Sequence, residues 1–159
     1  MVLWTFLTAV LFLALAPVVS FMVRNHPYEH LYFNRFAGRD MQEVKQQFEL
    51  DYWGLSNRQS LEYIVRTDTA SVIRLYTTSY PGRLNIAMLD PRDRSRIVLV
   101  RTPDEAEYFM SDYRFHPAPF PFPWEIYSVR VGNATINSVF GSTALRERLD
   151  AARAPGRTR

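Results

Sequence analysis

"EIYSVRVGNATINSVF", residues 125–140, is the stretch that decides the fold of this chain. Apolar and polar side chains alternate on both sides of Gly132-Asn133, and such alternation is typical of strands that are buried on one face. A Gly-Asn pair between two strands forms the tight turn of a hairpin. We therefore predict a C-terminal β-hairpin over residues 125–140, to which the rest of the domain must fit.

Segments upstream of the hairpin alternate between helical and strand-like patterns. The strand-like segments are rich in β-branched and aromatic residues, and the helical ones repeat their apolar residues every three to four positions. This order predicts a small α/β domain with a mixed sheet. The predicted strands are 71–78, 96–101 and 106–114. The predicted helices are 39–48, 57–66 and 83–90. The last of these follows a predicted turn at "YPG" and is stopped by Pro91.

Residues 48–54, "FELDYWG", also alternate and predict a further short strand that ends at Gly54. On such a strand Glu49, Asp51 and Trp53 share one face. Two carboxylates on one face can serve glycoside hydrolysis or bind a hard cation, although a half-exposed strand has the same pattern. Ser56 with Gln59 three residues later matches a capping box at the start of the next helix.

The segment "HPAPFPFPW", residues 116–124, contains four prolines and cannot form a helix or a central strand. Phe120, Phe122 and Trp124 are costly to leave in water, so we predict that the segment crosses the domain and packs its rings inward. The alternative is an exposed ligand for a proline-recognising domain.

The first 23 residues, "MVLWTFLTAVLFLALAPVVSFMV", contain no charged side chain. A bilayer core takes roughly 20 apolar residues as a helix, so we predict a single transmembrane helix over residues 1–23. A cleaved signal peptide is the alternative, but cleavage after Ala16 would leave Pro17 at the cut, and no basic residue precedes the apolar run. The rest divides into a membrane-proximal domain, 24–140, and a basic tail, 141–159.

The net charge of +3 lies in that tail. Residues 24–140 hold fourteen basic and fourteen acidic residues, whereas 141–159 hold five Arg against Glu147 and Asp150. A balanced domain with a short basic tail predicts no nucleic-acid partner. The tail is typical of a solvated terminal helix that frays, with binding to anionic lipid or phosphate as the alternative. The chain has no cysteine, which excludes disulfides and thiolate chemistry.

His26, Glu29 and His30 have the H-x-x-E-H spacing of inverted zinc peptidases. Such a site needs both histidines one helical turn apart and a third protein ligand. Pro27 requires His26 to lie at or before the start of a helix, and no spacing marks a third ligand. We therefore favour a membrane-surface junction without a metal, with His26 and His30 as the alternative ligands. No nucleophile elbow or nucleotide-binding glycine loop is present, and we predict no cofactor.

Four segments together carry a family resemblance: "HPYEHLYFNRFAG", "FELDYWGLSNRQSLEYI", "YFMSDYRFHP" and "EIYSVRVGNATINSVF". They resemble the C-terminal region of polytopic membrane glycosyltransferases of the GT-C class, which is similar in protein mannosyltransferases and lipid-linked sugar transferases. That region runs from the last membrane helix into an extracytoplasmic α/β domain. The resemblance extends from the hydrophobic segment to about Phe140.

The catalytic carboxylate of that class lies in the first extracytoplasmic loop, which has no counterpart here. The resemblance therefore implies an accessory or truncated C-terminal domain, such as a split subunit, that is not catalytically complete by itself. No residue is assigned as catalytic, and His30 stands where the family pattern has an aromatic residue. The implied partners are the lipid bilayer, a polytopic membrane subunit and a lipid-linked sugar. Candidate sugar or lipid contacts are the aromatic and acidic residues Tyr28, Tyr32, Phe33, Glu49, Asp51 and Trp53.

Two considerations disagree about the side on which the domain lies. Arg24, Arg35 and Arg39 follow the apolar segment and nothing basic precedes it, so the charge rule favours the cytoplasm. The resemblance implies the extracytoplasmic side, which we adopt because upstream helices dominate orientation in a polytopic parent. A single-pass scaffold that docks a partner and a small membrane zinc peptidase are the alternative functions.

Overall fold

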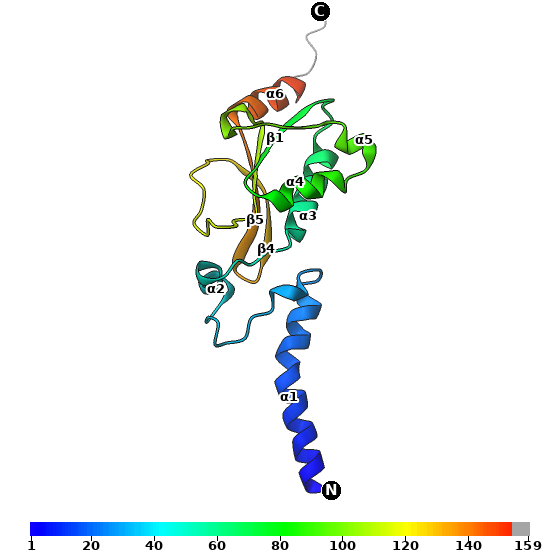
Figure 1. Ribbon diagram of the computed structural model, residues 1–159, viewed down its shortest axis with the longest axis vertical. Coiled ribbons are helices and arrows are strands. Elements are labelled where there is room, and N and C mark those ends of the chain that lie inside the picture. The colour runs from blue at the N-terminus through cyan, green and yellow to red at the C-terminus, as the bar shows by residue number, and fades with distance from the viewer. Residues whose placement is uncertain (154–159) are drawn as a thin grey trace, which may run out of the picture.

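The computed structural model describes residues 1–153 and consists of one long helix followed by a small α/β domain (Figure 1). The domain contains a five-stranded mixed sheet with the strand order β2-β1-β3-β5-β4. The fold class predicted from the sequence is thereby confirmed. The helices are α1 (Val2–Arg24), α2 (Met41–Gln47), α3 (Leu55–Thr67), α4 (Tyr80–Ala87), α5 (Pro91–Arg94) and α6 (Thr143–Arg153), with 3₁₀ turns η1 (Glu29–Leu31) and η2 (Pro103–Glu105). The strands are β1 (Ile73–Thr77), β2 (Ile97–Leu99), β3 (Tyr108–Ser111), β4 (Glu125–Val131) and β5 (Ala134–Gly141).

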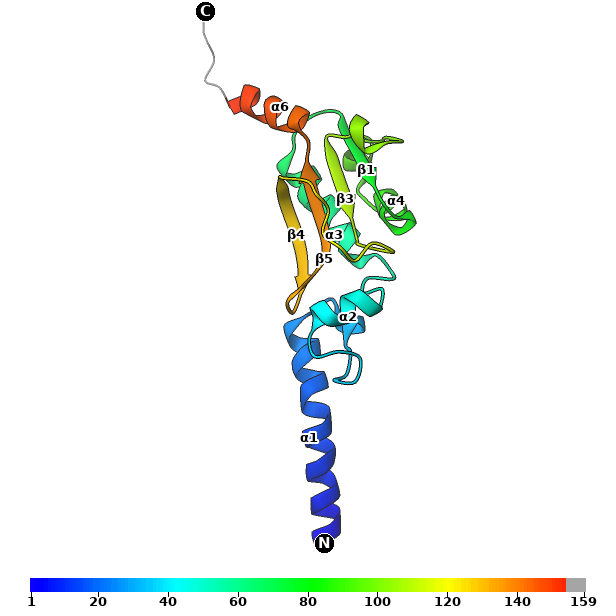
Figure 2. The ribbon, with the colours of Figure 1, turned by 90° about the vertical axis from the view of Figure 1, so that its left-hand side faces the viewer.

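Helix α1 extends away from the domain as a separate rod (Figure 2). It has a mean hydropathy of 2.5 and none of that window is buried, so it is long and apolar enough to cross a membrane. Its 23 residues correspond to about 35 Å at 1.5 Å per residue, slightly more than the hydrocarbon thickness of a bilayer. Pro17 lies within the helix without ending it.

The sheet is parallel in one half and antiparallel in the other. Strand β1 pairs in parallel with β2 and with β3, while β5 pairs antiparallel with β3 and with β4. The predicted hairpin is confirmed, since Val131 pairs with Ala134 across the Gly132-Asn133 turn. Gly132 has φ +57°, a left-handed conformation that this turn requires and that glycine adopts without strain.

Helices α3 and α4 contact each other and cover the same face of the sheet, α3 over β4 and β5 and α4 over β1. Leu61 and Ile64 of α3 are fully buried there against strand residues such as Leu75. The opposite face is covered by the proline-rich segment. Phe120 and Phe122 lie 4.9 and 4.6 Å from the ring of Phe109, which confirms the predicted structural role of this segment.

A second apolar core joins the end of α1 to the domain. Leu31 of η1 and Val44 of α2 pack with Val131 and Ile136 of the hairpin, and Phe21 of α1 borders the cluster. Figure 2 shows the end of α1 beside α2 and the tip of the hairpin. The junction is therefore a packed base and not a flexible linker.

Four sequence predictions about local structure are wrong. Residues 48–54 form no strand, because the Asp51–Gly54 stretch turns back on itself with Gly54 N donating to Asp51 O. Helix α3 begins at Leu55 with Gly54 as its N-cap residue, and the carboxylate of Asp51 accepts from the N–H groups of Leu55 and Ser56, so Ser56 does not act as the cap. The "YPG" turn is the first turn of α4, where Ser79 caps the helix and proline at a first helical position is well tolerated. Pro91 begins α5 and does not stop α4, which ends at Ala87.

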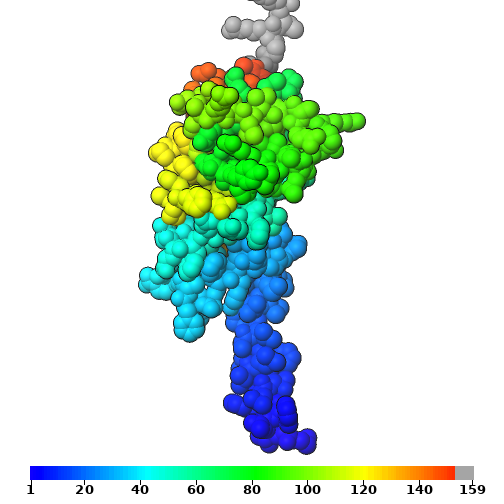
Figure 3. All heavy atoms as spheres, in the orientation of Figure 1, coloured from blue at the N-terminus to red at the C-terminus, as the bar shows by residue number. Residues whose placement is uncertain are grey.

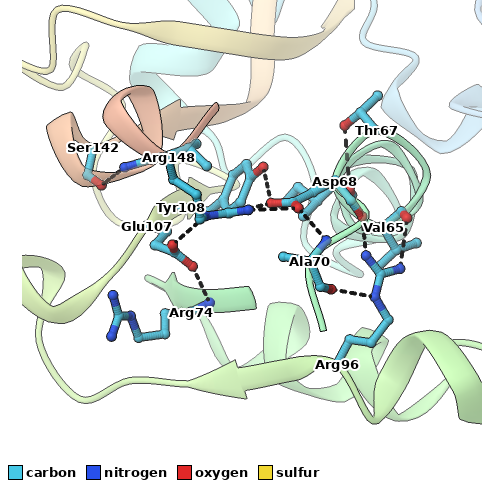
Figure 4. A network of polar contacts seen from close by, with 12 residues as sticks. Val65, Thr67, Asp68, Ala70, Arg74, Arg96, Glu107, Tyr108, Ser142 and Arg148 are labelled. Carbon is cyan, nitrogen blue, oxygen red and sulfur yellow. Dashed lines mark hydrogen bonds and ion pairs between the residues drawn. The ribbon is translucent and has the colours of Figure 1, made fainter. Parts of the chain in front are cut away.

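Helix α6 lies at the end of the domain opposite α1 (Figure 1). The sequence favoured a fraying helix here, and in the structure the helix is anchored by buried Leu145 and by Arg148. Figure 4 shows the guanidinium of Arg148 between the carboxylates of Asp68 and Glu107. Residues 154–159, the rest of the predicted basic tail, lie outside the described residues.

Candidate functional site

The candidate site forms where the α2–α3 linker, residues 48–54, meets the loop that follows β3, residues 112–117. Two cavities adjoin this contact. One, of about 180 Å³, lies between the two segments and the last turn of α2. The other, of about 570 Å³, lies between the linker and α4. In Figure 3 this part of the surface lies between the α1 base and the body of the domain.

The topology of the sheet places this site at the carboxyl ends of two parallel strands. From β1 the chain crosses through α4 and α5 to β2 on one side, and then returns to β3 on the other. Open α/β sheets bind ligands in the crevice at such a switch point. Thr78 after β1 donates to Ser111 of β3 at 3.0 Å across this crevice.

Buried polar side chains hold the floor of the site. The Asp112 carboxylate accepts from Asn57 Nδ2 at 3.0 Å and from Ser79 Oγ at 2.5 Å. Asn137 of β5 in turn donates to Asn57 at 3.0 Å and accepts from Ser60 at 2.7 Å. Each of these groups has a partner, so the network fixes the positions of α3, α4 and the β3 end relative to one another.

The two predicted carboxylates, Glu49 and Asp51, have separate partners and do not act as a pair on one strand face. Asp51 is 4% exposed and accepts from the backbone N–H groups of Leu55 at 3.0 Å and Ser56 at 2.8 Å, as well as from the Ser56 hydroxyl. Glu49 Oε2 lies 3.3 Å from Arg114 Nε. Asp51 is thus the anionic cap of α3, and Glu49 is the counter-ion of Arg114.

Replacing Asp51 with alanine is expected to lower the free energy of unfolding by about 1–2 kcal/mol, because two backbone donors of α3 lose their acceptor. Urea unfolding of the full chain in detergent micelles, followed by circular dichroism, measures this. Glu49→Ala is the control, with an expected loss below about 1 kcal/mol for a partly exposed ion pair. Equal losses in the two variants would show that Asp51 is not a cap.

Arg114 lines both cavities and was not among the predicted contact residues, although it lies in the segment "YFMSDYRFHP" that carries part of the resemblance. Its side chain is 22% exposed, and its guanidinium lies over the rings of Tyr52 at 4.7 Å and Phe115 at 5.0 Å. Nε makes no aligned hydrogen bond despite its closeness to Glu49. Tyr113 and Phe115 on either side have φ +59°, a rare conformation for bulky residues that their surroundings must impose.

The larger cavity is a mainly apolar cleft with a polar rim. Trp53 is 75% exposed and meets Tyr52 edge to face at 5.2 Å, and Leu84 and Met88 also line the cavity. Leu84 lies on α4 and Met88 directly follows the last residue of that helix. His30, Asn85 and Arg114 are polar residues of its lining, and the buried Asn85 amide donates to Gly54 O and Pro81 O.

The other predicted contact residues, Tyr28, Tyr32 and Phe33, lie where α1 joins the domain and line neither cavity. Tyr28 is buried and donates to Gln59 at 2.5 Å, and burial together with the charge of Asp51 raises its pKa. Tyr32 meets Phe21 of α1 edge to face at 5.5 Å, and Phe33 lies 5.3 Å from Phe48. The structure therefore places Glu49 and Asp51 at the smaller cavity and Trp53 at the larger one, and leaves Tyr28, Tyr32 and Phe33 outside both.

The H-x-x-E-H residues do not share one helix. Turn η1 starts at Glu29, so His26 precedes it, as the position of Pro27 predicted. His26 Nδ1 contacts the carboxylate of Glu29, while His30 Nε2 lies 3.7 Å from Asp51 Oδ1 on the other side. Among residues 1–153, no group of three or more His, Asp or Glu side chains is placed to hold a metal ion.

Comparison of the chain with protein-family models, curated proteins and solved structures finds no match. The features of this chain that bear on function are therefore the cleft and the apolar helix α1.

Proposed function

We propose that this chain is a membrane-anchored, glycosyltransferase-related accessory domain that binds the head group of a lipid-linked sugar in the cleft beside Trp53. The observation that carries the proposal is the exposed Tyr52–Trp53 pair at the mouth of an open, mainly apolar cleft. The apolar faces of a sugar ring stack on aromatic rings, while its hydroxyls take hydrogen bonds from a polar rim. Arg114 on that rim suits the phosphate that links sugar to lipid.

The position of the cleft fits a ligand that is held in a bilayer. Helix α1 presents apolar side chains all round, which favours a lipid environment for it. His30 lines the cleft and follows Arg24, the last residue of α1, by only six positions. A head group at the membrane surface would therefore lie within reach of the cleft.

The state of the nearby carboxylates favours binding over catalysis. Asp51 and Asp112 are buried and accept hydrogen bonds from the scaffold, and Glu49 is paired with Arg114. A general acid or base needs a carboxyl group that faces the ligand with a proton to exchange. This arrangement supports an accessory role beside a separate catalytic subunit.

Replacing Trp53 with alanine is expected to weaken binding of a polyprenyl-phosphate-linked hexose by about tenfold or more, since an aromatic anchor at a binding site carries 1–3 kcal/mol. The test is a titration of the full chain in nanodiscs, read by native mass spectrometry. Phe36→Ala is the matched control, because that ring is fully exposed and lies outside the cleft.

Unchanged binding in Trp53→Ala, or loss of the same size in Phe36→Ala, would contradict the proposal. Equal affinity for polyprenyl phosphate without sugar would show that the cleft recognises lipid and not sugar. Absence of binding to the intact chain would leave the single-pass scaffold as the better interpretation.

A further inference from the structure

Lys45, in the last turn of α2, has an environment that is unusual for a lysine. It is the single lysine of the chain and is 8% exposed. Its Nζ lies 3.3 Å from the centre of the Tyr113 ring. Within residues 1–153 this ammonium forms no ion pair and no hydrogen bond, whereas buried lysines are ordinarily paired.

Open space adjoins this amine in spite of its burial. Lys45 lines the cavity of about 180 Å³ between the α2–α3 linker and the loop after β3. It also lines a neighbouring cavity of about 320 Å³, which Tyr113, Glu125 and Phe120 share. A small molecule that enters either cavity therefore meets Lys45 without unfolding of the domain.

The charged groups around Lys45 are engaged with other partners. Glu125 of β4 accepts from Ser138 at 2.5 Å, Asp112 accepts from Asn57 and Ser79, and Asp51 caps α3. From the remaining elements, Glu49 and Arg114 pair with each other, and Glu43 on α2 itself pairs with Arg39. Burial lowers the pKa of Lys45 to about 8, although the charge of Glu125 opposes that effect. Near pH 7 the fraction of neutral amine is therefore about two orders of magnitude above that of an ordinary lysine.

We propose that Lys45 is a reactive amine site that takes small aldehydes as imines. The nitrogen lone pair attacks the carbonyl carbon to form the C–N bond, and the carbonyl oxygen becomes the hydroxyl of a carbinolamine. The oxygen then leaves as water with both protons of the neutral amine, and the C=N bond forms. The step needs no oxidant or reductant. This proposal concerns a different side chain and a different cavity from the cleft beside Trp53, so a test of one does not decide the other.

The test treats the full chain in detergent micelles with propanal and sodium cyanoborohydride at pH 7 and maps the alkylated peptides by mass spectrometry. Arg66→Lys supplies an exposed reference lysine on α3 in the same molecule. We expect Lys45 to be alkylated about tenfold faster than this reference or more, because more of it is neutral. Labelling at an equal or lower rate, including no labelling, would overturn the proposal.

A pH series and two further variants test the cause. The alkylation rate at Lys45 should reach half of its plateau near pH 8, while the alkylation rate at the reference lysine continues to rise up to about pH 10. A midpoint at or above pH 10 for Lys45 would also overturn the proposal. Lys45→Arg keeps the charge and should lose the internal adduct, and Tyr113→Leu should change the Lys45 rate. Circular dichroism verifies that both variants fold.

Discussion

Replacing Arg148 with methionine is expected to lower the free energy of unfolding by about 3 kcal/mol, at the lower end of the range for breaking a buried ion pair. Arg148 Nη1 and Nη2 donate to the two oxygens of Asp68, the former at 3.1 Å and the latter at 2.5 Å, and Nε donates to Glu107 at 2.8 Å (Figure 4). Asp68 is only 2% exposed and Glu107 is also buried. The variant therefore leaves two buried carboxylates without their counter-charge and removes the polar anchor of α6.

The same variant should change the pH dependence of stability. Burial raises the pKa of Asp68, but hydrogen bonds from Arg148, Ala70 and Tyr108 outweigh burial and lower it to about 2. Because this value lies below that of the unfolded chain, about 3.8, the contribution is complete above that pH and is lost as the pH falls toward 2. Without Arg148, burial dominates and the pKa rises, so we expect the variant to lose stability as the pH increases and Asp68 ionises.

Urea unfolding of the full chain in micelles at pH 4 and pH 7, followed by circular dichroism, tests both expectations. Arg146→Met is the matched control, because Arg146 lies on the same helix, is exposed and only covers the Trp124 ring at 4.6 Å. Its expected cost is below about 1 kcal/mol. Equal costs for the two substitutions, or a pH-independent loss in Arg148→Met, would refute the role of this network.

Replacing Gly54 with alanine should have the second large effect, lowering the free energy of unfolding by about 2–5 kcal/mol. Gly54 has φ +69°, and the left-handed conformation costs a residue with a Cβ about 1–2 kcal/mol. A Cβ at this position would also lie 2.4 Å from Pro81 Cβ and 2.8 Å from Asn57 Nδ2, which adds an overpacking cost of about 1–3 kcal/mol. Since Gly54 follows Trp53, the displacement should also alter the cavity that Trp53 lines.

Gly132→Ala separates the two causes. Gly132 has φ +57° in the hairpin turn, but its added Cβ would meet only the Met41 side chain, at 3.1 Å from Cγ. We expect Gly132→Ala to lower the free energy of unfolding by about 1–2 kcal/mol, which is the cost of the left-handed conformation alone. Thermal unfolding of both variants gives the comparison. A Gly54→Ala loss no larger than that of Gly132→Ala would show that the helix α4 packing against Gly54 is loose.

Local sequence patterns predicted the hairpin, strands β1, β2 and β3, and helices α2 and α3, because each depends on periodicity within about ten residues. They failed for residues 48–54, where the alternation resembles a strand. The carboxylate of Asp51 instead finds the free N–H groups at the start of α3, and a short polar side chain that caps a helix draws the chain into a turn. The early start of α4 was missed because Pro81 is compatible both with a turn and with the first turn of a helix.

Of the candidate site, the sequence indicated Glu49, Asp51 and Trp53 but not Arg114, Met88 or Lys45. The last three come from separate segments that meet only when the sheet brings the ends of β1 and β3 together. No spacing along the chain encodes such a meeting. The burial of Lys45 also depends on Tyr113, whose φ +59° follows from tertiary contacts.

The sequence by itself determined that this chain has an uncharged helix long enough for a bilayer and a small α/β domain that ends in a hairpin. Those features depend on short-range periodicity and on the water-avoiding character of single segments. Only the tertiary structure decided which carboxylates serve as caps and counter-ions, which aromatic rings stay exposed in a cleft, and that the single lysine is buried beside a cavity. Burial and pairing arise between residues far apart in the chain, because the free energy of a polar group depends on the neighbours that folding supplies.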